Sequence, residues 1–274
     1  MRKKAKALIL YPAVYILPVL MAAAQNIDEY KGHLSFKDVK KAAIVIKESY
    51  YKEGDKKVGD TVYTVPVKME GVSFFSDIFR MTQDVLKKYT HLQIATDHQE
   101  SDLIVEVNVA GVALRVVYSD GCFHYAGVSI KAIVLFKAAD GSTVKGEHEY
   151  KMPPMGMIVE DKYLSPQDAP FLDVLPSVLY KALFKAIYRA FGISPLVAAL
   201  DDADYEIRLS VVDTLGVIGN RCALKVLISS LKDNYDMVRE EIARVLSVLT
   251  GQNFGINYDL WQEWWQKNKD SYSE

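Results

Sequence analysis

The sequence predicts an α+β fold, in which a curved, antiparallel-rich sheet domain with packed helices precedes a short all-α solenoid. Residues 102–151 alternate apolar and polar positions around an Asp-Gly pair at each turn, the pattern of consecutive antiparallel strands. Residues 196–252 instead repeat themselves at an offset of 31, with apolar residues at helical spacing. A chain of 274 residues has room for about two domains. We expect these to be residues 25–192 and residues 193–274.

The chain begins with a basic cluster and an apolar run. Four of the first six residues are basic, and residues 7–24 carry no charge and end in Ala22-Ala23-Ala24. These are the parts of a secretory signal peptide, so we expect cleavage near Gln25 and a periplasmic or other extracytoplasmic location. A retained membrane anchor through residues 7–24 is the alternative, because 18 uncharged residues approach the roughly 20 that span a bilayer. A cytoplasmic scaffold that keeps this segment is a third possibility.

Charge argues against a nucleic-acid partner, and cysteine content argues against a disulfide framework. The 33 basic and 35 acidic residues nearly balance, but residues 194–274 carry 8 basic against 13 acidic side chains, a net charge of −5. Nucleic acid is therefore not an expected partner, since binding it requires a clustered basic face. Cys122 and Cys222 are too few for a disulfide framework and are read as free thiols.

The first domain contains a sheet with helices packed on it. Strands are expected at residues 42–47, 61–68, 91–96, 102–118, 127–137 and 143–151. Pro66 places its strand at a sheet edge, and a switch of apolar parity at Gly111 predicts a bulge. Amphipathic helices are expected over residues 75–89 and 172–191, the second beginning or kinking at Pro176 and ending at Gly192.

This order of elements is similar to small α+β domains of bacterial envelope lipoproteins and transport-auxiliary proteins. The run Ser101–Val107 carries the resemblance together with the element order.

Two copies of one helical hairpin follow. Residues 196–220 align with residues 227–251, and each copy has an aspartate followed six residues later by an arginine: Asp202 and Arg208, then Asp233 and Arg239. We expect each aspartate to cap the second helix of its hairpin and each arginine to reach such a carboxylate, forming a ladder between repeats. Ser194 and Pro195 are expected to begin the first hairpin directly after the preceding helix, which couples the domains rigidly.

Residues 194–265 resemble a HEAT-repeat protein of the short bacterial type, as found in bilin-lyase relatives. The repeated Asp and Arg positions carry this resemblance, which implies a stacked helical surface. Asn257 is expected to cap a last helix that covers the end of the array with Leu260, Trp261, Trp264 and Trp265.

The pattern predicts an exported, envelope-associated protein–protein interaction or assembly module that is not an enzyme and has no cofactor. Its partner is a protein of unknown identity. The candidate partner-binding residues are Arg208, Asp213, Arg239 and Arg244. Asp213 and Arg244 are expected at exposed positions of the second helices, whereas the ladder is the favoured role of the other two.

Two alternatives remain open. The resemblance to bilin-lyase relatives implies a possible enzyme-accessory or lyase-like role. Met152, Met155 and Met157 form a thioether-rich loop that suits Cu(I), although a hydrophobic loop folded over the sheet explains it as well. The five histidines have no metal-ligand spacing on one helix, and His148 is expected to be a packed or edge residue.

Overall fold

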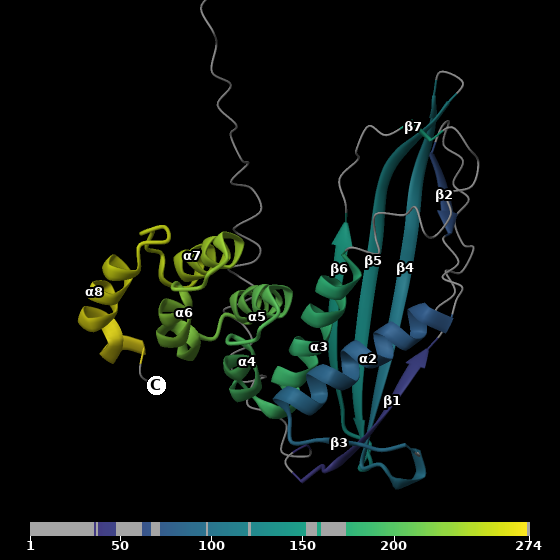
Figure 1. Cartoon of the computed structure of the whole chain (residues 1–274), viewed down its shortest axis with the longest axis horizontal. Helices are drawn as coiled ribbons and strands as arrows, with labels where there is room; N and C mark the ends of the chain where they lie inside the picture. The colour runs from purple at the N-terminus through teal and green to yellow at the C-terminus, as the bar shows by residue number, and fades with distance from the viewer. Residues whose placement is uncertain are drawn as a thin grey trace, which may run out of the picture.

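The computed structural model describes residues 36, 38–47, 62–66, 72–96, 98–119, 122–151, 158–159 and 174–272. Within these ranges a mixed sheet with helices on one face leads into a helical region (Figure 1). The predicted α+β fold with a helical array is confirmed. The expected leader, residues 1–24, and the methionine loop, residues 152–157, lie outside the described residues, and both interpretations stay predictions.

The sheet combines parallel and antiparallel strands. Its strands are β1 (Lys41–Lys47), β2 (Val62–Pro66), β3 (Gln93–Ile94), β4 (Leu103–Ser119), β5 (Cys122–Ala138), β6 (Thr143–Lys151) and β7 (Ile158–Val159). The order is β3-β1-β4-β5-β6, while β2 pairs with the far half of β4 and β7 pairs with the start of β5. The expected antiparallel meander is β4-β5-β6. In contrast, β1 runs parallel to both β3 and β4.

Local features of the meander agree with the sequence. The register of β4 against β5 shifts between Ala110 and Ala113, which confirms the bulge at Gly111. Gly141 has a φ of 89°, and the Asp140 side chain accepts a hydrogen bond from the Ser142 N–H at 2.8 Å, so this Asp-Gly pair makes the predicted turn. Among the described strands, β2 pairs with β4 alone, in agreement with the edge position expected from Pro66.

Two helices cover one face of the sheet. The first is α2 (Val72–Tyr89) and the second is α3 (Leu175–Phe191), which has Pro176 in its first turn and Gly192 as its C-cap. The core between them and the sheet includes the fully buried side chains of Leu103, Val105, Val107, Ile130, Ala132, Val134 and Phe136. Gly146 on β6 permits the close approach of α3, because an added Cβ would lie 1.9 Å from the Ala182 carbonyl oxygen.

The array forms two layers of helices beside the sheet domain. Its helices are α4 (Ser194–Ala199), α5 (Tyr205–Ile218), α6 (Leu224–Ser230), α7 (Asp236–Thr250) and α8 (Tyr258–Asn268), with short 3-10 turns at Arg221–Ala223 and Lys269–Tyr272. Figure 1 shows α3, α5 and α7 as a row, with α4 and α6 beneath them. The residue at the N-cap of α4 is Ile193, so the expected cap at Ser194 was wrong by one position.

The last helix closes the end of the array. Trp261 is fully buried and donates its indole N–H to the Gly255 carbonyl at 2.8 Å, and Asn257 accepts the Leu260 N–H at 3.1 Å as the predicted N-cap. Trp264 lies edge-on to Trp261. The capping role is therefore confirmed, with one correction: Leu260 is 43% exposed and does not belong to the apolar face.

The sheet domain and the array are in direct contact. Helix α3 packs against α5. The Asn220 amide donates to the Tyr188 hydroxyl at 2.9 Å, and Lys88 on α2 lies 2.8 Å from the buried carboxylate of Asp202. One helix–helix packing and two polar contacts thus join the two parts.

Candidate interaction surface

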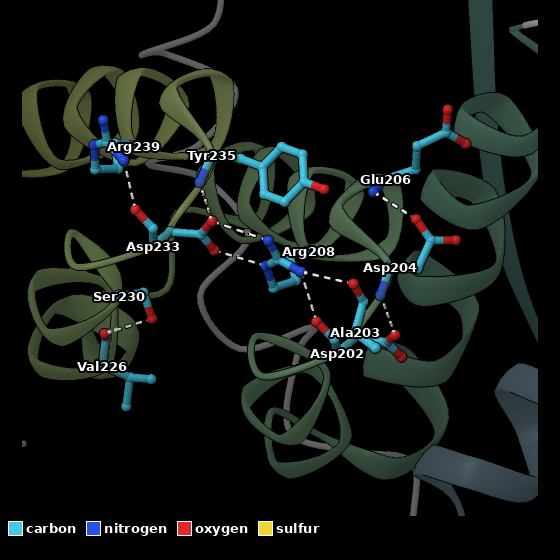
Figure 2. Close-up of polar contacts among 10 residues, drawn as sticks. All are labelled: Asp202, Ala203, Asp204, Glu206, Arg208, Val226, Ser230, Asp233, Tyr235 and Arg239. Carbon is cyan, nitrogen blue, oxygen red and sulfur yellow. Dashed lines mark hydrogen bonds and ion pairs between the residues drawn. The ribbon is translucent and has the colours of Figure 1, made fainter.

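A buried arginine joins the turns of the two repeats. Arg208 on α5 binds the Asp233 carboxylate with two hydrogen bonds, of 2.6 Å from Nε and 2.9 Å from Nη2 (Figure 2). Its Nη1 donates to the carbonyls of Asp202 at 2.6 Å and Ala203 at 3.2 Å. The Arg208 and Asp233 side chains are only 10% and 8% exposed. The predicted ladder is therefore present between the repeats, and it leaves little of Arg208 for a partner.

The same aspartates do not cap the helices as expected. The carboxylates of Asp202 and Asp233 accept the N–H groups of Asp204 and Tyr235, at 2.7 and 2.8 Å. Each makes an Asx turn that begins two residues before the N-cap of the helix. Asp204 is the N-cap of α5, while Tyr235 at the N-cap of α7 supplies no side-chain hydrogen bond. The capping prediction was wrong because the turn occupies these side chains.

The second arginine stays within its own repeat. Arg239 donates to the Asp233 carbonyl at 2.6 Å and forms an ion pair with Asp236. The position 31 residues after Asp233 is Trp264 on the capping helix, which has no carboxylate to offer. The ladder consequently has one ion pair between the repeats, Arg208 with Asp233, which we call the rung.

Hydrogen bonding sets the charge state of the rung. Burial alone would raise the pKa of Asp233, but the hydrogen bonds from Arg208 and from the Tyr235 N–H outweigh it, so this pKa lies below its ordinary value. The Asp233 carboxylate in turn raises the pKa of Arg208. Both groups are charged throughout the neutral range.

A second polar network crosses three helices. Asp213 on α5 lies 3.2 Å from Lys181 on α3 and 3.6 Å from Arg244 on α7, and Arg244 also binds Glu241 through two hydrogen bonds. The Arg244 side chain is 54% exposed, as expected. That of Asp213 is only 19% exposed, so the expectation of an exposed position was wrong. The network links the sheet domain to both repeats.

Apolar side chains flank this network. Val217 is 52% exposed and lies one helical turn beyond Asp213, and Val248 is 43% exposed and lies one turn beyond Arg244. The two valines are 31 residues apart, so they occupy equivalent positions in the two repeats. We call Lys181, Asp213, Val217, Arg244 and Val248 the helix-row surface. The sequence pattern did not single out either valine, although their spacing was the available signal.

Beside this surface, two side chains of α3 bind backbone carbonyls of β6. Lys185 donates to the Glu147 carbonyl at 3.1 Å, and Arg189 donates to the Lys145 carbonyl. These bonds occupy backbone acceptors that another strand would otherwise use. On the face of β6 that Gly146 presents to α3, burial and the nearby Lys185 and Lys181 lower the pKa of His148 to about 4. His148 is a packed residue, as predicted.

Comparison with known proteins identifies the class of the array. Residues 192–252 match the family described as HEAT repeats, which includes both turns of the ladder and the helix-row residues of α5 and α7. Among curated proteins, none matches the chain. The match supports a HEAT-repeat protein, and HEAT repeats commonly serve as protein-interaction or scaffold modules.

The described residues offer few features for other chemistry. Within these ranges, no group of three His, Cys, Asp or Glu side chains is arranged to hold a metal ion. The Cys222 side chain is exposed. No helix among the described residues is both long and apolar enough to cross a membrane.

Proposed function

We propose that this protein is an exported, envelope-associated interaction or assembly module that binds a partner protein through the helix-row surface and performs no covalent step. The observation that carries the proposal is the continuity of this surface. Lys181 of the sheet domain, Asp213 of the first repeat and Arg244 of the second form one connected network. A partner that lies along the row would therefore contact both parts of the protein.

The chemistry of the surface suits a protein partner. Exposed valines at equivalent places in two repeats provide apolar area, and charged groups beside them provide orientation, as in the core and rim of an interface. Arg244 is the strongest single candidate contact. It is half exposed, already positioned by Glu241 and Asp213, and arginine is enriched where interfaces gain most of their energy.

Affinity capture with paired variants tests the surface. Val217→Glu and Val248→Glu together place two charges on the helix row without removing a buried group, so a partner retained by the unaltered chain is expected to be lost. Leu260→Glu is the matched control, because Leu260 is also an exposed apolar residue but lies on the capping helix. Equal retention by all three chains would contradict the proposal.

Export rests on the sequence of the first 24 residues and has its own test. The intact mass of the protein recovered from extracytoplasmic, membrane and cytoplasmic fractions reports whether the leader is removed. A chain that begins near Gln25 outside the cytoplasm supports export. A full-length chain in the cytoplasm would contradict the envelope location while leaving the helix-row surface standing.

A further inference from the structure

A second exposed patch lies at the turns that precede α5 and α7. The rings of Tyr205 and Tyr235 stack with 4.8 Å between centroids and 11° between planes. Tyr235 is 49% exposed, and Met237, two residues further on, is 59% exposed. The stacked tyrosine pair with Met237 nearby in the sequence places exposed apolar surface at these turns, and exposed apolar surface of this kind is typical of binding sites. The patch is separate from the helix-row surface, because Met237 and Val248 lie three turns apart on α7.

The charge beside the patch is negative. Residues 201–206 contain four acidic side chains and no basic one. Lys88 is paired with Asp202, and Arg208 is paired with Asp233, so these two bases are already engaged. Asp204 is exposed and follows the buried Asp202 in the turn. In Figure 2, Asp204 and the Tyr235 ring lie near the turns that precede α5 and α7. We call Asp204, Tyr205, Tyr235 and Met237 the aromatic–acidic edge.

The electrostatic effect of these acids reaches the neighbouring tyrosines. Glu206 raises the pKa of Tyr205 chiefly through its charge. Burial raises the pKa of Tyr180 on α3 to about 12, and Asp204 and Glu206 add to this shift. The edge therefore carries a negative potential that favours a cationic ligand.

We propose that the aromatic–acidic edge binds a basic, arginine-containing peptide segment of a partner protein. The aliphatic stem of an arginine covers the exposed surface of Tyr235 and Met237 while its guanidinium reaches the Asp204 carboxylate. The chain contains an internal precedent for this arrangement. Arg208 lies 5.4 Å from the Tyr235 ring centroid and binds a carboxylate with two hydrogen bonds. Guanidinium is preferred over ammonium because it can bind a carboxylate in this bidentate way.

Fluorescence anisotropy with the full-length chain tests the proposal. The probe is a labelled peptide that contains several arginines spaced by glycine and serine. Asp204→Asn removes the charge but keeps a good N-cap, so the helix is retained while the affinity falls about fivefold. Met237→Ala lowers the affinity by a smaller factor, about threefold, through lost apolar contact. Asp259→Asn is the matched control, since Asp259 also lies exposed in the first turn of a helix, α8.

The expected pattern is binding by the unaltered chain and by Asp259→Asn, weaker binding by the two edge variants, and a loss of affinity as salt is raised. Three results would overturn the proposal. The first is that the arginine peptide does not bind the unaltered chain. The second is that Asp204→Asn and Asp259→Asn bind the arginine peptide with equal affinity. The third is that a peptide with glutamate in place of arginine binds the unaltered chain equally well. Loss of peptide binding in Val217→Glu/Val248→Glu would place the peptide on the helix row and would equally overturn the edge proposal.

Discussion

The rung between Arg208 and Asp233 should be a large contributor to the stability of the array. Asp233→Ala removes a carboxylate whose side chain is 8% exposed and leaves the guanidinium of Arg208 buried without its bidentate partner. Breaking a buried pair from one side typically costs about 3–5 kcal/mol. Arg208 keeps its bonds to the carbonyls of Asp202 and Ala203, so we expect about 3 kcal/mol.

Urea unfolding monitored by tryptophan fluorescence suits this measurement. All three tryptophans lie on α8, so the signal reports the array rather than the sheet domain. The control is Asp236→Asn. Asp236 pairs with Arg239 but its side chain is 79% exposed, so the expected loss is about 1 kcal/mol or less.

A double variant separates the ion pair from other effects of the substitution. Arg208→Met with Asp233→Ala removes both charges, so it should be more stable than Asp233→Ala alone, with a coupling energy of about 2 kcal/mol. Losses that simply add in the double variant would refute the assignment of the rung as a coupled pair.

Acid should weaken the same rung in a predictable direction. The pKa of Asp233 is lower in the folded protein than in the unfolded chain, so its contribution is complete above the unfolded pKa of about 3.9. That contribution is lost as the pH falls through the lower, folded pKa. The pH dependence of unfolding below about pH 4 should therefore be shallower in Asp233→Asn than in the unaltered chain.

Four further substitutions test the packing. Gly146→Ala should destabilise the sheet domain by about 2 kcal/mol or more in thermal unfolding, because the added Cβ meets backbone atoms of α3. Gly216→Ala, whose added Cβ meets the Val245 side chain rather than backbone, should cost less. The pKa of His148 is about 4 in the folded protein against 6.5 in the unfolded chain, so the unfolded chain binds more protons between these values. The free energy of unfolding should therefore decrease as the pH falls from 6.5 to about 4, and His148→Gln should flatten this slope. Trp261→Ala should cost about 3–5 kcal/mol and speed amide exchange in α6.

Periodicity allowed much of the fold to be predicted. The amphipathic spacing located α2 and α3, and the internal repeat located α5 and α7. The alternation of residues 102–151 located the meander. Patterns of this kind are strong because one face of each element is buried, as the fully buried alternate residues of β4 show.

Features set by pairing between distant segments were missed. The parallel pairing of β1 with β3 and β4 depends on the crossover through α2, which no local pattern encodes. β3 and β7 have two residues each, too few for a period. β5 begins at Cys122 rather than at Gly127, because its first residues do not alternate.

The interaction surface was only partly predictable, for a physical reason. The spacing of Asp and Arg correctly indicated a ladder, but Asp202 and Asp204 are both suitable cap residues, and the sequence did not decide between them. Asp213 was expected to be exposed because it is charged, yet Lys181 from the other domain covers it. Val217 and Val248 are apolar residues within amphipathic helices, so the sequence alone does not distinguish them from buried residues. Only the packing of the helices shows that they are exposed.

Site-specific photo-crosslinking tests the central claim most directly. A photoreactive amino acid would replace Val217 in one chain and Lys225, an exposed residue on α6 outside the row, in another. Each chain would be irradiated in cells that produce the protein naturally. The helix-row account predicts a discrete crosslinked protein from position 217 that Val248→Glu abolishes, with little product from position 225. Equal crosslinking at both positions, or product from position 225 alone, would contradict it.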